Sequence, residues 1–157
     1  MSSGPEDALD RWRVREPRDA DEQRWRELYS GYAEFYEVQQ TQADAERVWG
    51  WIRDPHHELN CLLAEHHDGR VVGLAHYRPF ARPLSASTGC FLDDLFVDPA
   101  ERGGGVADAL LDELRRLSVA KGWSVVRWIT ADNNYRARPK YDQYATRTAW
   151  ITYDMTV

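Results

Sequence analysis

The sequence predicts an α/β fold, with a mixed central β-sheet of about six or seven strands and helices on both faces. Apolar or alternating runs typical of strands are interspersed with segments whose apolar residues recur every three or four positions, as in helices. One apolar run passes directly into a helical segment through consecutive glycines. The 157 residues, 43% of them hydrophobic, suffice for one sizeable core but are short for two domains. We therefore expect a flexible N-terminus over residues 1–10, rich in Ser, Gly, Pro and acid, and a single domain over residues 11–157.

The first half of the chain is expected to form a short strand, two helices and a hairpin, over residues 12–14, 19–32, 41–54, 61–66 and 70–77. A capping pattern followed by apolar residues at i, i+3, i+4 and i+7 from Trp25 indicates the first helix. The second helix is capped by Thr41 and ends before Pro55. Asp68-Gly69 is a strong turn signal, which predicts the hairpin.

The second half is expected to begin with a polar loop and to continue as strand, helix, strand, short helix and last strand, over residues 78–88, 90–97, 106–121, 123–130, 134–145 and 149–157. Val106 starts an apolar stripe of helical period, and Lys121-Gly122 is a usual C-terminus. Residues 123–130 are apolar enough for a strand buried on both faces.

The junction from Arg102 to Ala107 has the features of an anion site. Glycines allow a tight turn that brings backbone N–H groups close together, and the following helix leaves its first N–H groups unpaired. Arg102 adds a planar set of donors suited to phosphate. A Walker A loop would need Gly-Lys-Ser/Thr, and a dinucleotide fingerprint needs a small residue where Asp108 stands. The junction therefore predicts another kind of phosphate site, the alternative being a glycine turn without a ligand.

The junction resembles the phosphate-binding motif of the GNAT family of N-acetyltransferases, Arg/Gln-x-x-Gly-x-Gly/Ala, with Arg102, Gly105 and Ala107 at its fixed positions. The expected element order from Trp12 onward is also that of the family. The resemblance implies that acetyl-CoA is the cosubstrate, with its pyrophosphate on the glycine loop and its pantetheine along the preceding strand. The cofactor-binding residues that it implies are Leu95, Phe96, Val97, Arg102, Gly103, Gly104, Gly105, Val106, Ala107 and Asn134.

Asp93 and Asp94 lie in the most apolar predicted strand, where carboxylates are costly to bury. Adjacent residues of a regular strand point to opposite faces, so a bulge is needed to bring both to one site. The resemblance implies such a bulge, and the pair is similar to that of the spermidine/spermine and thialysine N-acetyltransferase branch. We expect a catalytic or substrate-binding role, with Asp93 slightly favoured as the base and Asp94 as anchor. The alternative is a pair of buried structural carboxylates.

Residues 133–141 resemble the last motif of the family, Asn-x-x-Ala followed four residues later by Tyr, which Asn134, Ala137 and Tyr141 match. The resemblance implies that Asn134 contacts the cofactor and that the catalytic Tyr141 protonates the departing thiolate. The alternative is that Tyr141 only packs on the core. Pro139 would disrupt a helix interior, so the helix either kinks or begins at Pro139.

Glu34 and Tyr36, together with Asp93, are expected to bind the substrate, because acidic and aromatic side chains can hold a cationic amine. A helix end with a core aromatic explains Glu34 and Tyr36 equally well. The predicted reaction is direct transfer of an acetyl group to a primary amine of a small molecule, polyamine or amino-acid-like. The alternatives are a non-catalytic acyl-CoA sensor and an acetyltransferase of protein N-termini or lysines.

Charge and composition limit the kinds of binding partner that we expect. The net charge of −6 and pI near 5.3 argue against nucleic acid or an anionic membrane as the main partner. No residue spacing frames a zinc site, so no metal is expected. Cys61 and Cys90 fit buried thiols in a reducing cytosol, and no apolar run suggests a signal or membrane segment. We expect a cytoplasmic homodimer.

Overall fold

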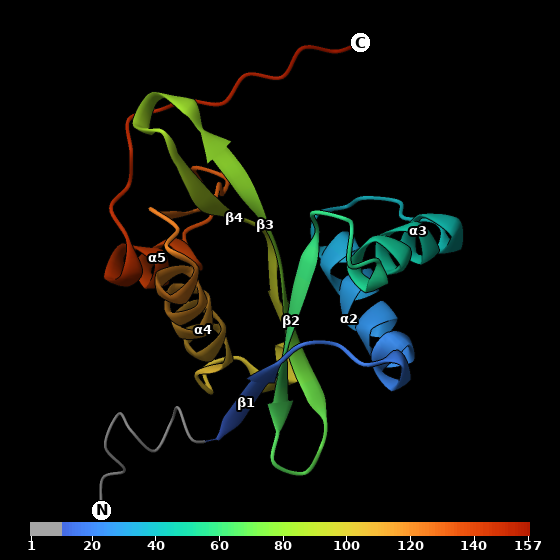
Figure 1. Ribbon diagram of the computed structural model, residues 1–157. Coiled ribbons are helices and arrows are strands. Elements are labelled where there is room, and N and C mark those ends of the chain that lie inside the picture. The colour runs from blue at the N-terminus through green and yellow to red at the C-terminus, as the bar shows by residue number, and fades with distance from the viewer. Residues whose placement is uncertain (1–10) are drawn as a thin grey trace, which may run out of the picture.

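The structure is a computed structural model that describes residues 11–157, so the predicted flexible N-terminus, residues 1–10, lies outside the described part. Its centre is a five-stranded sheet in the order β1-β2-β3-β4-β5 (Figure 1). The strands are β1 (Trp12–Arg15), β2 (Asn60–His66), β3 (Val71–Arg82), β4 (Ser87–Val97) and β5 (Val126–Arg127). Neighbours are antiparallel except β4 and β5, which run parallel, so the predicted mixed sheet is confirmed.

The helices cover both faces of the sheet, as predicted. They are α2 (Glu22–Phe35), α3 (Gln42–Arg53), α4 (Val106–Lys121) and α5 (Arg138–Tyr144). Figure 1 shows α2 and α3 on one side of the sheet and α4 and α5 on the other. Single turns of 3-10 helix lie at Asp19–Asp21, Pro83–Ser85 and Pro99–Glu101. No helix within residues 11–157 is both long and apolar enough to span a membrane.

Each face of the sheet has its own apolar core. Leu74 packs in the cluster that Trp25 of α2 joins, and its neighbour Ala75 packs in the cluster that Leu110 and Leu114 of α4 join. This split follows from strand geometry, since successive side chains of β3 point to opposite faces. The apolar stripes that predicted α2 and α4 from the sequence are therefore the surfaces that attach these helices to the sheet.

The predicted loop at residues 78–88 is wrong, because β3 continues through Arg82 and β4 already begins at Ser87. Pro79 signalled a loop, yet it lies in β3 opposite Cys90. It is tolerated because β2 begins at Asn60, opposite Tyr77, so no β2 residue pairs with β3 at Pro79. Proline is tolerated at such an edge, because no neighbouring strand needs the N–H that proline lacks.

The predicted sheet of six or seven strands is also wrong. Only Val126 and Arg127 of the expected strand 123–130 form ladder pairs, because β4 and β5 diverge beyond them. The expected last strand, residues 149–157, is not formed in this chain. The segment instead runs past the turn between β3 and β4 and ends away from the rest of the described chain (Figure 1).

Candidate functional site

β4 and β5 separate soon after they meet. They pair at Cys90 with Val126 and at Phe91 with Arg127, and β4 then continues to Val97 without β5 beside it. On its other edge β4 stays paired with β3, up to Val97 opposite Gly73. The free edge after Phe91 presents backbone N–H and C=O groups that an extended ligand can pair with, in the manner of an added strand.

The glycine loop at the end of β4 has the backbone that its sequence implied. Gly103 and Gly105 have φ values of 82° and 87°, which side chains rarely permit. A Cβ on Gly104 would lie 3.1 Å from the Glu101 carbonyl oxygen. The Trp12 indole N–H of β1 donates to the Gly104 carbonyl oxygen at 2.8 Å and so fixes the loop against β1.

The loop leads into the first turn of α4, whose N-cap residue Gly105 has no side chain to cap the helix. Its first backbone N–H groups therefore point out of the helix without intrahelical partners. α4 starts close against the sheet, because a Cβ on Gly73 of β3 would lie 2.8 Å from a Val106 methyl carbon. The result is a fixed group of donors at the positive end of a helix dipole, which suits a phosphate.

Arg102 is exposed beside this loop and lines a hollow of about 430 Å³ together with Phe96 and Glu34. Glu34 therefore lies beside the glycine loop rather than with the acidic pair. The ring of Tyr36 packs edge to face against Tyr32, with centroids 4.9 Å apart. Neither Glu34 nor Tyr36 lines the cavity of the acidic pair described below, so their predicted contact with the substrate remains a prediction.

The predicted bulge in β4 is present at the acidic pair. The β3–β4 register runs from His76 opposite Asp94 to Tyr77 opposite Leu92, which leaves Asp93 as the extra residue. Because the bulge cancels the usual alternation, Asp93 and Asp94 line the same cavity. Two consecutive carboxylates thus face one cavity, whereas in a regular strand they would point to opposite faces of the sheet.

Asp94 is held by a buried hydrogen-bond chain that the sequence did not reveal. Its Oδ2 lies 2.8 Å from Nδ1 of His76, whose side chain is 0% exposed. The Trp25 indole N–H donates to Nε2 of the same ring at 2.9 Å. Indole is only a donor, so Nε2 must accept and Nδ1 carries the proton that it donates to Asp94. A neutral imidazole in a fixed tautomer therefore orients the carboxylate.

Asp93 has a different partner. The Arg78 guanidinium of β3 donates from Nε to both carboxylate oxygens, at 3.0 and 3.2 Å. Burial raises the pKa of the Asp93 carboxyl above its ordinary value, and the Arg78 charge opposes this shift. Asp93 is thus a stronger base than a solvated aspartate, with a cation that steadies its anionic form.

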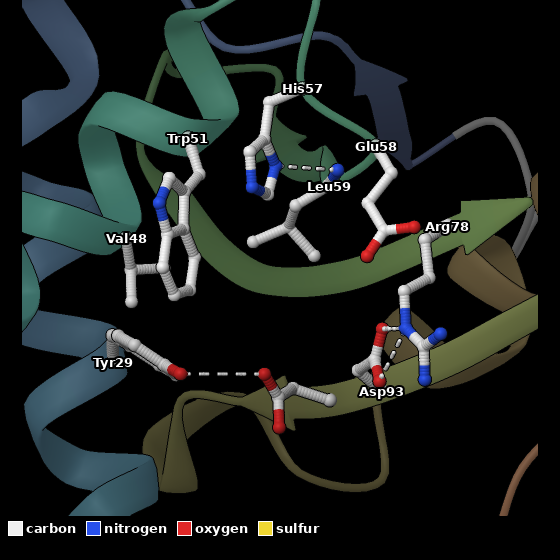
Figure 2. A pocket seen from close by; sticks show the side chains of 9 residues that line it. Tyr29, Val48, Trp51, His57, Glu58, Leu59, Arg78 and Asp93 are labelled. Carbon is white, nitrogen blue, oxygen red and sulfur yellow. Dashed lines mark hydrogen bonds and ion pairs between the residues drawn. The ribbon is translucent and has the colours of Figure 1, made fainter.

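The cavity around the pair measures about 340 Å³ and draws its walls from several elements (Figure 2). They are Tyr29, Val48, Trp51, His57, Glu58, Leu59, Arg78, Asp93 and Asp94. The Trp51 and His57 rings stack at 5.0 Å with an interplanar angle of 1°. Figure 2 shows Arg78 reaching Asp93 from the side opposite to Tyr29.

Carboxylates outnumber cationic side chains around this cavity. Glu58 joins Asp93 and Asp94, and Arg78 is the one Arg or Lys among the residues that line it. Burial and the nearby Asp94 charge raise the pKa of the Tyr29 phenol to about 12, so the phenol stays neutral. An acidic hollow with aromatic walls attracts a cationic amine rather than an anion.

α5 resolves the two possibilities left open by Pro139. The helix begins at Arg138 with Pro139 in its first turn, so it is short rather than kinked there. The Tyr141 ring packs edge to face against Trp128 at 5.4 Å. Burial, with a smaller contribution from Tyr36, raises the pKa of the Tyr141 phenol, which keeps its proton on.

Asn134 stabilises the turn before α5, because its side-chain amide donates to the Thr130 hydroxyl at 3.1 Å and its side-chain carbonyl oxygen accepts from the Ala137 N–H at 3.3 Å.

A contact between α5 and α4 was not predicted from the sequence. Asp108, in the first turn of α4, accepts from the Lys140 ammonium at 2.9 Å and from the Tyr144 hydroxyl at 2.9 Å. This contact ties the helix that carries Tyr141 to the helix that begins at the glycine loop.

Cys61 and Cys90 are buried and free, and burial raises the pKa of the Cys90 thiol to about 11. Neither is therefore a ready thiolate nucleophile. Among residues 11–157 no group of three or more His, Cys, Asp or Glu side chains is placed to hold a metal ion.

Sequence reasoning missed the cavity residues Trp51, His57, Glu58 and Arg78 and the positioning role of His76. Two of these could have been found by pairing the expected strand 70–77, extended by one residue, with 90–97. Such a hairpin sets His76 and Arg78 near the acidic pair, and both are even-numbered residues on one face of β3. The residues from α3 and the loop after it carry no comparable signal.

Comparisons with known proteins agree with this arrangement. Residues 25–145 match the acetyltransferase (GNAT) family. A D-amino-acid N-acetyltransferase of Saccharomyces cerevisiae is 26% identical over 139 residues, which cover 88% of this chain and 85% of the relative. The crystal structure of a ribosomal-protein-alanine N-acetyltransferase from Brucella melitensis superposes with a TM-score of 0.78 at 21% identity, covering 93% of this chain and 99% of the other.

An aminoglycoside acetyltransferase from an uncultured soil metagenomic sample, solved with sisomicin, gives a TM-score of 0.76 at 14% identity and covers 94% of this chain and 98% of its own. These structural likenesses show the fold, and the family match covers most of the chain. The chain belongs to the GNAT family and is an acetyltransferase.

Proposed function

We propose that this acetyltransferase moves an acetyl group from acetyl-CoA to the primary amine of a small cationic molecule, a polyamine or an amino-acid-like amine. The observation that carries the proposal is the bulge that turns Asp93 and Asp94 into one aromatic-walled cavity. A substrate site that must both attract an ammonium ion and remove its proton is well served by two carboxylates in that position.

The residues at the end of β4 fit the coenzyme. The glycine loop and the first turn of α4 offer free backbone N–H groups, from Gly103 to Ala107, for the pyrophosphate. The open edge of β4 at Leu95, Phe96 and Val97 offers pairing groups for the pantetheine. Arg102 adds a cation beside the loop. Acetyl-CoA, when bound there, supplies the acetyl group as an activated thioester.

The cavity selects the other substrate by charge and size. Glu58 and Asp94 favour a cation, and Tyr29 and Trp51 present ring surfaces that such a cation can contact. A volume of about 340 Å³ suits a small molecule or one arm of a larger amine. In this proposal Asp94, fixed by His76, anchors the ammonium group while it is still charged.

An amine must lose its proton before it can attack a thioester. With a reference pKa near 10.4, forming the free base costs roughly 4–5 kcal/mol at neutral pH. Asp93 accepts this proton, directly or through water, because burial raises the pKa of its carboxyl and so makes it a stronger base than a solvated aspartate. This keeps the preference for Asp93 that the sequence suggested.

Tyr141 completes the proposal as the group that donates a proton or hydrogen bond to the departing sulfur. Its raised pKa keeps the phenol protonated, as a general acid must be. Transfer is direct, since both cysteines are buried thiols rather than thiolates. The tie between Asp108 and Lys140 holds α5 in place for this role.

The test is a panel of amines assayed for release of coenzyme A from acetyl-CoA. It contains polyamines, diamino acids, neutral amino acids, an aminoglycoside and, as matched controls, dicarboxylic amino acids of similar size. We expect the cationic amines to be acetylated with the highest kcat/KM and the dicarboxylic controls to be poor substrates. Turnover confined to protein N-termini or protein lysines, or coenzyme binding without turnover of any amine, would overturn the proposal.

A further inference from the structure

The three consecutive glycines of the loop do not share one explanation. Gly103 and Gly105 have positive φ values, whereas the φ of Gly104 lies outside that region. The phosphate-binding motif of the family also leaves the position of Gly104 open. Neither the backbone angle nor the motif therefore requires glycine at this position, and the reason must lie in its contacts within this chain.

Two neighbours leave little room for a side chain at Gly104. A Cβ there would lie 3.1 Å from the Glu101 carbonyl oxygen, closer than such contacts usually are, and would reach the Trp12 ring at 3.4 Å. The bare backbone thus lets the loop lie close against the indole. At this short range the Trp12 indole N–H donates to the Gly104 carbonyl oxygen at 2.8 Å.

Trp12 is itself held firmly. It is 7% exposed and belongs to the same apolar cluster as Val106 and Leu110 of α4. It begins β1 opposite His66, whose ring it meets edge to face with centroids 5.2 Å apart. Because the indole is packed in this way, its N–H keeps one direction, and the hydrogen bond fixes the direction of the Gly104 carbonyl.

The direction of this carbonyl determines the direction of the next N–H group. The Gly104 carbonyl and the Gly105 N–H belong to one trans peptide plane, in which C=O and N–H point in opposite directions. Since the carbonyl is directed toward β1, the Gly105 N–H is directed away from β1. No group within residues 11–157 accepts a hydrogen bond from it. Gly105 is the N-cap of α4, so its N–H adds to the unpaired donors at the start of this helix.

We propose that Trp12 is a positioning residue for the coenzyme, because it holds the Gly104 carbonyl and thereby directs the Gly105 N–H toward the pyrophosphate of acetyl-CoA. A donor that is oriented before binding costs less conformational freedom when the ligand arrives. Without the indole, a peptide flanked by glycines can turn, since glycine admits both signs of φ. The inference rests on the proposed placement of the pyrophosphate, and it adds a residue that lies 92 positions earlier in the chain.

The first test is Trp12→Phe, with the dissociation constant of acetyl-CoA measured by isothermal titration. Phenylalanine keeps an aromatic ring in the cluster but has no N–H to donate. We expect the dissociation constant to rise by about three- to tenfold, the effect of losing one hydrogen bond. At saturating acetyl-CoA, kcat and the KM of the amine should stay those of the wild type. An unchanged dissociation constant would overturn the proposal.

Trp49→Phe is the matched control. Trp49 is 8% exposed, and it packs against Trp25 in the core on the other face of the sheet. Thermal unfolding should show a comparable loss of stability in Trp49→Phe and Trp12→Phe, while Trp49→Phe binds acetyl-CoA like the wild type. If Trp49→Phe weakened the coenzyme equally, lost stability would explain both results and the proposal would fail.

Gly104→Ala tests the same contact without removing a core side chain. The added Cβ crowds the Glu101 carbonyl and the indole, so the loop must move from its position on Trp12. Acetyl-CoA should bind more weakly, and the double variant with Trp12→Phe should lose less than the product of the two separate effects, because both changes act on one hydrogen bond. Unchanged binding by Gly104→Ala, or effects that multiply fully, would contradict the proposal.

The acetyl donor separates positioning from a general loss of structure. S-acetylpantetheine carries the thioester and the pantetheine but has no pyrophosphate. In Trp12→Phe, kcat/KM for acetyl-CoA should fall by about three- to tenfold while kcat/KM for S-acetylpantetheine stays that of the wild type. Equal losses with both donors would show that Trp12 supports the fold rather than the pyrophosphate site. Wild-type coenzyme binding by Gly105→Val would instead overturn the placement of the pyrophosphate itself.

Discussion

The two sides of the candidate site are built in different ways. On the coenzyme side, the glycine loop, the start of α4 and the free edge of β4 present mostly backbone groups from one continuous stretch, residues 95–107. On the amine side, the cavity is made of side chains from α2, α3, the loop after α3, β3 and β4. Backbone donors can bind the same phosphate whatever surrounds them, whereas the set of side chains in the cavity decides which amine fits.

The sharpest way to break the coenzyme side is Gly105→Val. Its φ of 87° is a conformation that a β-branched residue rarely adopts, so the loop backbone would have to change to accept valine. We expect acetyl-CoA binding to be abolished while the circular dichroism spectrum stays that of the wild type. Isothermal titration with acetyl-CoA measures this. Gly122→Val is the matched control, because Gly122 also has a positive φ, of 70°, but follows the last turn of α4, at the end of that helix opposite to the loop.

If Gly105→Val bound acetyl-CoA with unchanged affinity, the pyrophosphate would lie elsewhere. If Gly122→Val lost the coenzyme as well, backbone strain rather than the loop itself would explain the loss.

The amine side should be broken most strongly by the double change Asp93→Asn and Asp94→Asn. It keeps the side-chain shapes and removes both charges from the cavity, so kcat/KM for the best amine should fall by about 10²–10⁴ at pH 7. Acetyl-CoA affinity should not change, since the two sides of the site are separate. An unaltered rate would show that neither carboxylate is base or anchor.

Tyr141→Phe should have a smaller effect. It keeps the ring against Trp128 and removes the hydroxyl, so we expect kcat to fall by about tenfold or more with little change in coenzyme affinity. Because burial raises the pKa of this phenol, the group stays protonated at higher pH than a solvated tyrosine. The wild-type kcat should therefore show no decline on account of Tyr141 in the pH range where a solvated tyrosine is still protonated. A wild-type kcat in the variant would mean that water or another residue protonates the sulfur.

The smallest expected effect distinguishes two kinds of substrate. Arg78 is the cation of an otherwise acidic cavity and pairs with Asp93. Arg78→Gln should raise KM a few-fold if the amine carries a carboxylate, and lower it if the amine is a polyamine, because the charge then repels the substrate. KM values for a diamino acid and a polyamine of equal length measure the difference. Equal responses to both would indicate that Arg78 does not face the substrate.

The contrast between the two sides also explains how much the sequence could predict. The backbone of the glycine loop was predicted from residue types within a short segment, and the bulge at the acidic pair was predicted from the resemblance to the GNAT family. His76 acts through contacts with Trp25 and Asp94, and Trp51 lines a cavity that it shares with residues of β3 and β4, so neither role can be read from a local pattern. The last strand was predicted from an alternating pattern, but residues 149–157 pair with no strand within residues 11–157. Local backbone geometry could be predicted, and contacts between distant segments could not.

The central claim is that the bulged acidic pair removes a proton from a bound amine. The most direct measurement is the pH dependence of kcat/KM for the best amine with the wild type and with Asp93→Asn. If Asp93 is the base, the variant should be slow at pH 7 and approach the wild type as pH nears the amine's own pKa, where the free base is abundant. Parallel profiles, in which the variant keeps the same relative rate at every pH, would contradict a role for Asp93 in proton removal.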